Sequence, residues 1–178
     1  MGELGTLRTV IEGLSAGGGR PAVVAFGEEG VERWSYGELA GRVRGLAGGL
    51  RGIGVERGET VAVLCANRPE WIAACLAVIS AGAVVVPLDV QLGDETLGGI
   101  LEDSGVRRVF TTADQAERLA ELEDPGLRAI LLDVGEGDGR SWRCRPWARM
   151  SNFRRSNRAT ERRCSTLRAR RARPKGCR

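Results

Sequence analysis

The stretch from Val61 to Asp89, VAVLCANRPEWIAACLAVISAGAVVVPLD, constrains the fold of this 178-residue chain more than any other feature. Two runs in it, Val61 to Cys65 and Ala83 to Pro87, are apolar without alternation, which is typical of strands that helices cover on both faces of a sheet. The residues between them have the length and apolar content of a helix. A strand, a helix and a second strand in this order predict one parallel βαβ unit.

Start and stop signals set the bounds of the predicted helix. Asn67 is a candidate N-cap with Glu70 three residues later, and Pro69 stands in the first turn, where a missing N–H costs nothing. Gly82 can adopt the left-handed conformation in which many helices end. We therefore expect the helix to begin at Asn67 and to end at Gly82.

The rest of the chain up to residue 134 continues this pattern. A helix and a hairpin come first, a capping box at Ser35 to Glu38 opens a second helix, and Asp94 is the expected N-cap of a later one. From residue 60 onward strands and helices alternate, which predicts an α/β fold with a parallel sheet and flanking helices. The expected elements are helices at Thr6 to Ala16, Ser35 to Leu50, Asp94 to Gly105 and Ala113 to Leu122, a hairpin of Ala22 to Phe26 and Val31 to Trp34, and strands at Val106 to Thr111 and Ala129 to Val134.

Charge is distributed unevenly along the chain. Residues 1–140 contain 13 Arg and 22 Asp or Glu residues, a net charge of −9. Residues 141–178 contain 14 Arg or Lys residues and the single acid Glu161, a net charge of +13. The net charge of the whole chain, +4, therefore describes neither part and gives no reason to expect specific nucleic-acid binding.

Other patterns argue against several classes of protein. No apolar run is long enough to span a bilayer, so we expect no transmembrane segment. The first residues, MGELGTLRTVIEGL, lack the basic start and continuous apolar core of a signal peptide, and we expect a cytoplasmic protein. Five cysteines at irregular spacing and the lack of histidine argue against a disulfide framework and a zinc site.

Four features could carry chemistry, and each has a simpler structural interpretation. Gly52-Ile53-Gly54 with Gly58 resembles part of a dinucleotide-binding fingerprint, but it follows a helix and precedes a strand, the reverse of the required order, so we expect a turn. The acid pairs Glu28–Glu29 and Glu102–Asp103 fall in a turn and at a helix end, where carboxylates are usually solvated. Trp71 is expected to pack against the core. We therefore assign no catalytic, cofactor-binding or metal-binding residue to this chain.

Six short motifs follow one another along the chain. They are Trp34-Ser35-Tyr36-Gly37-Glu38-Leu39, Leu46-Ala47-Gly48-Gly49-Leu50 before Gly54-Val55, Gly58-Glu59-Thr60-Val61-Ala62-Val63, Asn67-Arg68-Pro69-Glu70-Trp71, Ala81-Gly82-Ala83-Val84-Val85-Val86-Pro87-Leu88-Asp89, and Ile100-Leu101-Glu102-Asp103-Ser104-Gly105. Their order resembles the N-terminal region of AMP-forming adenylating enzymes over about residues 1–134. Within that superfamily the chain is most similar to acyl-CoA synthetases, the long-chain fatty acid CoA ligases.

This resemblance implies an activity for the intact enzyme. Such a ligase joins a fatty acid or other carboxylate to AMP from ATP, with Mg2+ and with loss of pyrophosphate, and then transfers the acyl group to CoA. A phosphate-binding loop similar to Tyr-Thr-Ser-Gly-Thr-Thr-Gly-Pro-Pro-Lys-Gly should follow the strand at Ala129, but the 178 residues contain no such sequence. We therefore expect residues 1–140 to form a partial N-terminal domain, and the chain to be inactive on its own.

The basic tail, residues 141–178, has the composition of a shifted reading frame. Of its 38 residues, 31 are Arg, Cys, Trp, Gly, Ser, Ala, Pro or Thr, which are encoded with G or C at the middle codon position. A one-base shift in a GC-rich gene moves the third codon base, nearly always G or C, to the middle. With suitable third bases, the codons for Thr166 to Gly176 read in the neighbouring frame as Tyr-Thr-Ser-Gly-Thr-Thr-Gly-Pro-Pro-Lys-Gly. We therefore hypothesise a frameshift near Trp142 to Cys144 and a disordered, arginine-rich tail.

Two other interpretations make different predictions. In the first interpretation the tail is a genuine arginine-rich arm. Such an arm binds nucleic-acid backbones with an affinity that falls steeply with salt. The second is a Rossmann-type dinucleotide-binding domain, which needs a glycine fingerprint after the first parallel strand. Cys65-Ala66-Asn67-Arg68 is not such a fingerprint, so the sequence disfavours this class.

Overall fold

The computed structural model describes residues 6–27, 30–122, 124 and 126–132. A four-stranded sheet lies at its centre, with strands β3 (Thr60–Leu64), β4 (Val84–Leu88), β5 (Arg108–Thr111) and β6 (Arg128–Leu131) in the order β4-β3-β5-β6. All three strand pairs are parallel. The predicted α/β fold with a parallel sheet is therefore confirmed.

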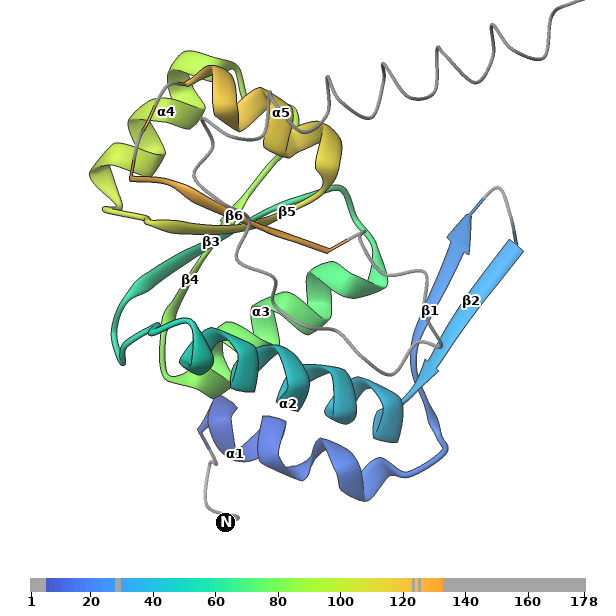
Figure 1. Ribbon diagram of the computed structural model, residues 1–178. Coiled ribbons are helices and arrows are strands. Elements are labelled where there is room, and N and C mark those ends of the chain that lie inside the picture. Colours follow the sequence, from blue (N-terminus) through green and yellow to red (C-terminus); the bar gives the residue numbers. More distant parts are fainter. Residues whose placement is uncertain (1–5, 28–29, 123, 125, 133–178) are drawn as a thin grey trace, which may run out of the picture.

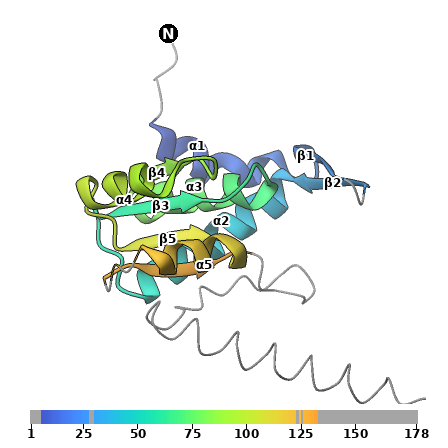
Figure 2. The ribbon, with the colours of Figure 1, turned by 90° about the horizontal axis from the view of Figure 1, so that it is seen from above.

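Helices cover both faces of this sheet, as Figures 1 and 2 show. On one face lie α3 (Pro69–Ala81), then α2 (Tyr36–Gly52) and α1 (Leu7–Gly13), and on the other lie α4 (Asp94–Asp103) and α5 (Ala113–Glu121). Two separate clusters of buried residues fill the spaces between the layers. Along β3, Val61 and Val63 belong to the α3 side and Ala62 and Leu64 to the α5 side, as alternation in a strand requires.

The central βαβ unit forms where the sequence predicts it, with one correction. Gly82 ends α3 in the left-handed region, at φ 88°, as expected. The predicted cap at Asn67 is wrong, because Arg68 occupies the N-cap position with extended backbone and no side-chain capping bond. Pro69 explains the shift, since proline disfavours helical backbone in the residue before it and is itself well suited to the first helical position.

The capping box of α2 is confirmed in detail. The backbone N–H of Glu38 donates to Ser35 Oγ at 3.2 Å, and the backbone N–H of Ser35 donates to Glu38 Oε2 at 2.7 Å. The bonds from the Ser35 backbone and hydroxyl, together with the nearby charge of Arg42, lower the pKa of the Glu38 carboxyl from its ordinary value.

The predicted hairpin is also confirmed, and it stands apart from the central sheet (Figure 1). Strands β1 (Pro21–Gly27) and β2 (Gly30–Ser35) pair antiparallel, with a short 3-10 helix at Leu14–Gly17 between α1 and β1. One face of the hairpin buries Val23 and Trp34 against the core, whereas Phe26 on the opposite face is 81% exposed.

Three further boundaries differ from the predictions. Gly93 rather than Asp94 is the N-cap of α4, and it makes no side-chain capping bond. The strand expected from Val106 begins only at Arg108, because the N–H of Val106 still bonds Leu101 at the end of α4. The last strand ends at Leu131, and the predicted Val134, the domain limit at residue 140 and the tail all lie outside the described residues.

Candidate functional site

The connections of the sheet diverge at the carboxyl end of β3. The chain passes from β3 through α3 to β4 on one side, and it returns through α4 on the opposite face to β5 on the other side of β3. In open α/β sheets ligands bind outside the carboxyl ends of the strands, where such connections separate. A ligand site is therefore expected at this end of the sheet.

A cavity of about 410 Å³ opens at this end. The segments after β3 and β4 form its two walls, and the first turn of α3 closes it on one side. Its lining consists of Cys65, Ala66, Asn67, Trp71, Pro87, Leu88, Asp89, Val90 and Gln91. We call it the carboxyl-end cavity.

The walls of the carboxyl-end cavity are suited to binding. Trp71 contributes a half-buried indole, and Asn67, Asp89 and Gln91 contribute exposed polar side chains. The loop after β4 has an internal bond, from the backbone N–H of Gln91 to Asp89 Oδ1 at 2.9 Å. The cavity thus offers one aromatic side chain and several hydrogen-bonding groups.

A single arginine of α5 holds the loop after β4. Arg118 donates from Nε to Asp94 Oδ1 at 2.6 Å, from Nη1 to the carbonyl oxygen of Val90 at 2.9 Å, and from Nη2 to the carbonyl oxygen of Leu92. Sequence analysis assigned no role to this arginine or to the loop. Polar residues directly after a buried strand, such as Asp89, were the available signal.

Polar side chains also follow β5, the other neighbour of β3. The buried Thr111 hydroxyl donates to the carbonyl oxygen of Leu64 at 2.9 Å, which ties the two strand ends together. The next residue, Thr112, donates its hydroxyl to Asp114 Oδ1, and this bond, with further bonds involving Gln115, lowers the pKa of the Asp114 carboxyl. These contacts rigidify the carboxyl end of the sheet.

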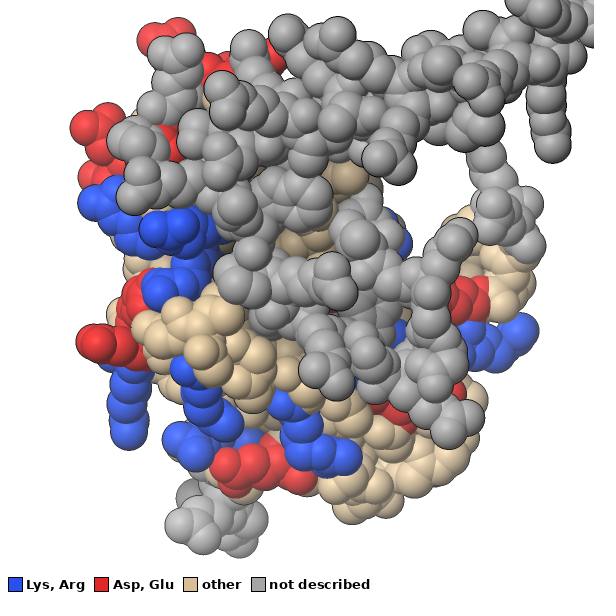
Figure 3. Space-filling model, viewed as in Figure 1, with Lys and Arg blue, Asp and Glu red and all other residues tan. Residues whose placement is uncertain are grey.

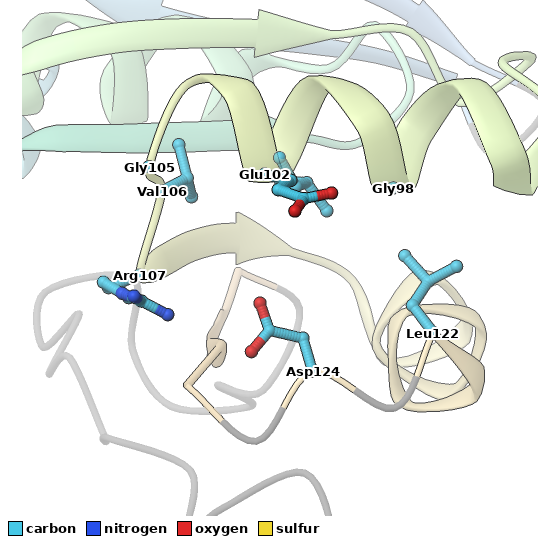
Figure 4. A pocket seen from close by; sticks show the side chains of 8 residues that line it. Gly98, Glu102, Gly105, Val106, Arg107, Leu122 and Asp124 are labelled. Atoms are coloured by element: carbon cyan, nitrogen blue, oxygen red, sulfur yellow. The ribbon is translucent and has the colours of Figure 1, made fainter.

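A second cavity, of about 470 Å³, lies at the opposite end of the sheet, and its lining comes mainly from the end of α4 and the turns before β5 and β6. Figure 4 shows the side chains of Arg107 and Asp124 extending toward one another across it, with Glu102 nearby. Asp124 accepts a bond from the backbone N–H of Gly126 at 2.7 Å, which makes it a turn residue. The amino ends of the strands are not where α/β sheets bind ligands, so we do not assign a site here.

The glycines, acid pairs and tryptophan considered as possible sites in the sequence can be located in the structure. Gly54 and Gly58 have φ values of 80° and 82° in the turn between α2 and β3, as expected for a turn rather than a phosphate loop. Glu102 and Asp103 are exposed at the end of α4, and Glu28–Glu29 lies outside the described residues. Trp71 does pack against the core, but it also lines the carboxyl-end cavity.

The described part of the chain has neither a cluster of metal ligands nor a membrane-spanning helix. Among these residues, no three His, Cys, Asp or Glu side chains come together in a way that could hold a metal ion. None of the described helices has both the length and the apolar content needed to cross a membrane. On the face shown in Figure 3, arginine and acidic side chains of the described residues are interspersed.

Comparison with known proteins identifies the class to which this α/β unit belongs. A sequence model of the family described as "AMP-binding enzyme" matches residues 14–152. The chain therefore belongs to the AMP-binding enzyme family.

Relatives in this family include ligases of several kinds. A feruloyl-CoA synthase of Amycolatopsis is 43% identical over 104 residues, which cover 58% of this chain and 21% of the relative. A long-chain-fatty-acid–CoA ligase of Mycobacterium bovis is 35% identical over 103 residues, which cover 56% of this chain and 17% of the relative. The chain thus spans about a fifth of the length of these curated relatives.

Solved structures share the fold. The adenylation domain of a carboxylate reductase from Mycobacterium chelonae matches with a TM-score of 0.65 and 23% identity, covering 78% of this chain and 25% of that one. The fatty acid AMP ligase of Legionella pneumophila matches with a TM-score of 0.63 and 23% identity, covering 80% and 26%. The described residues therefore have the fold of the first part of an adenylating-enzyme N-terminal domain.

Proposed function

We propose that this chain is the first part of an ATP-dependent, AMP-forming carboxylic acid:CoA ligase. The family match over residues 14–152 carries this proposal. In the proposed reaction a carboxylate oxygen attacks the α-phosphorus of ATP, pyrophosphate leaves and an acyl-adenylate forms. The CoA thiol then loses its proton and attacks the acyl carbon, which releases AMP and gives the acyl-CoA. Mg2+ would accompany ATP, as it does in most enzymes that transfer phosphoryl or nucleotidyl groups.

The acid that the ligase activates is proposed to be a fatty acid. The similarity to the long-chain-fatty-acid–CoA ligase of Mycobacterium bovis supports this choice. An aromatic acid is the second candidate, because the feruloyl-CoA synthase of Amycolatopsis has higher identity, 43% against 35%. The described residues supply binding surface at the carboxyl-end cavity, and we assign no catalytic, cofactor-binding or metal-binding role to any residue of this chain.

We further propose that the reading frame changes near Trp142 to Cys144. The composition of residues 141–178 supports this, as does the compatibility of Thr166 to Gly176 with a phosphate-loop sequence in the neighbouring frame. Residues 1–140 would then be ligase sequence and residues 141–178 would not, so the frame would change inside the last part of the matched range, residues 14–152. The competing proposal, an arginine-rich arm that binds nucleic acid, makes opposite predictions for the DNA and for the purified chain.

The frameshift proposal is tested by sequencing the genomic DNA across the codons for residues 135–178 and several hundred bases beyond. One inserted or deleted base that restores Tyr-Thr-Ser-Gly-Thr-Thr-Gly and an open frame would support it. If the frame stands, RNA binding should be measured at 50 and 200 mM salt with the chain and with a chain lacking residues 141–178. Binding that weakens steeply with salt and requires the tail would support the arm instead.

The ligase proposal is tested by measuring pyrophosphate release from ATP. The 178-residue chain should release none with fatty acids or ferulate, because no phosphate-binding loop is among its residues. The ligase encoded by the restored frame should release pyrophosphate only when a carboxylate is present, and should form acyl-CoA only when CoA is added. Comparing palmitate with ferulate by kcat/KM then decides between the two acid classes. Failure of the restored ligase with every carboxylate tried would contradict the proposal.

A further inference from the structure

The loop of residues 89–93 forms one wall of the carboxyl-end cavity through Asp89, Val90 and Gln91. It has little internal hydrogen bonding to define its shape. The N–H of Gln91 bonds Asp89 Oδ1 at 2.9 Å, and the N–H of Leu92 bonds the carbonyl oxygen of Asp89 at 3.3 Å. The position of this wall must therefore depend on contacts from outside the loop.

Val90 and Leu92 pack against the apolar cluster on the α5 side, and the hydrogen bonds that reach the loop from outside come from one side chain. Arg118 on α5 donates to the carbonyl oxygens of Val90 and Leu92 and to Asp94 Oδ1, the carboxylate of the first residue of α4. The Arg118 side chain is 21% exposed, so water competes poorly for its donors, whereas the Asp94 side chain is 63% exposed. The two bonds to backbone carbonyls should therefore matter more than the partly solvated ion pair.

We infer that Arg118 is a positioning residue, which fixes the loop of residues 89–93 as the ligand-binding wall of the carboxyl-end cavity. The expected effect on ligand binding rests on the proposed ligase function. The contacts of Arg118 with the loop do not depend on that function. The planar guanidinium presents its donors in a fixed fork that reaches several acceptors at once, which a lysine ammonium at the end of a flexible stem does not reproduce.

Amide hydrogen exchange of the 178-residue chain tests the inference directly. The reporters are the N–H groups of Gln91 and Leu92, which are bonded only within the loop. In the R118Q chain their exchange should accelerate by about tenfold or more, because the bonds from a charged donor to the loop carbonyls are lost. R118K should show most of this effect, and D94N, which keeps both carbonyl bonds, should stay within about twofold of the unaltered chain.

A matched control separates a local effect from a general loss of stability. R44Q removes the same charge from an exposed position on α2, on the other side of the sheet, and should leave loop exchange unchanged. Exchange in β3 and α3 should also be unchanged in R118Q. The inference is overturned if loop exchange stays within about twofold, if it rises equally in β3 and α3, or if the loop of the unaltered chain already exchanges at the unprotected rate.

A kinetic measurement tests the consequence for ligand binding. In the ligase encoded by the restored frame, R118K should raise KM for at least one of the carboxylate, ATP and CoA by about tenfold and change kcat by less than about twofold, because the loop carries no reacting group. A fall in kcat with all three KM values unchanged would overturn the inference. An inactive restored ligase would refute the proposed function. The hydrogen-exchange experiment would still test the role of Arg118, because it does not require activity.

Discussion

The helices α3 and α5 cover opposite faces of one sheet, but they bury their surfaces differently. α3 lies between the sheet and α2, and Ala73, Ala74, Ala77 and Val78 on it are all at most 1% exposed. α5 has no second layer of described residues over it, and only Ala116 and Leu119 are buried. A helix enclosed on two sides needs small apolar residues over a wide arc, whereas a helix with one covered side needs only a stripe.

This difference also determines where polar contacts form. The residues of α3 in the cluster toward α2 and the sheet are apolar, so packing dominates on that side, with one polar contact from Arg51 of α2 to the carbonyl oxygen of Ser80. On the α5 side the outer surface is free to carry charge, and Arg118 reaches from there to the loop beside the carboxyl-end cavity. The face with a single layer of helices therefore supplies the polar support of the candidate site.

The largest expected effect comes from the packed side of the sheet. Phe110 on β5 is fully buried in the cluster beneath α3. Phe110→Ala should lower the free energy of unfolding by about 3–5 kcal/mol, measured by urea denaturation, because it leaves a cavity that rigid neighbours cannot fill. The same substitution at Phe26, 81% exposed on the hairpin, should stay within about 0.5 kcal/mol. Equal losses at the two positions would contradict this picture of the core.

Enlarging a small residue compares the two helices directly. Ala77 of α3 is fully buried, and Ala77→Leu should cost about 1–3 kcal/mol because the added atoms fit on neither side. Ala120 of α5 is half-buried, and Ala120→Leu should cost less than about 1 kcal/mol because the side chain can extend toward solvent. Similar losses, measured by urea denaturation, would show that α5 is enclosed as tightly as α3.

The sequence predicted α3 well because its signals came from burial. Apolar runs at Val61 to Cys65 and Ala83 to Pro87 identified the two strands. Gly82 identified the end of the helix, because glycine readily adopts the left-handed backbone found there. Boundaries set by short-range competition were less predictable. Asn67 and Asp94 are both good capping residues, yet Pro69 moved one helix start and Gly93 took the other cap.

The candidate site was less predictable than the fold. Its lining comes from segments that are separate in sequence and meet only because β3 and β4 are neighbours in register. Arg118 looked like one of many surface arginines, since nothing local distinguishes an arginine that caps a distant loop from a solvated one. Such contacts follow from tertiary structure, which composition and periodicity do not specify.

Capping provides a smaller test of the packed side. Ser35→Ala should cost about 1 kcal/mol, because it removes the side-chain acceptor for the Glu38 N–H at the start of α2. Asn67→Ala should cost less than about 0.5 kcal/mol, because α3 begins at Pro69 without a side-chain cap. Urea denaturation of both variants measures the difference. A loss at Asn67 as large as at Ser35 would indicate that α3 depends on capping after all.

A pH dependence produced by burial of α3 has no effect near neutral pH and develops only in alkaline solution. Burial raises the pKa of the Cys75 thiol from 9.0 to about 11, because the thiolate is poorly solvated there. The folded state therefore favours the neutral thiol: its contribution to stability is complete below pH 9 and is lost as the pH rises from 9 to 11.

Under reducing conditions the stability difference between the unaltered chain and Cys75→Ala should be constant from pH 7 to 8.5 and should shift against the unaltered chain from about pH 9 upward. All other titrating groups are common to both proteins and cancel in this difference. A difference that stays constant up to pH 10.5 would mean that the thiolate is solvated in the fold, and that α3 is less enclosed on this side than its neighbours indicate.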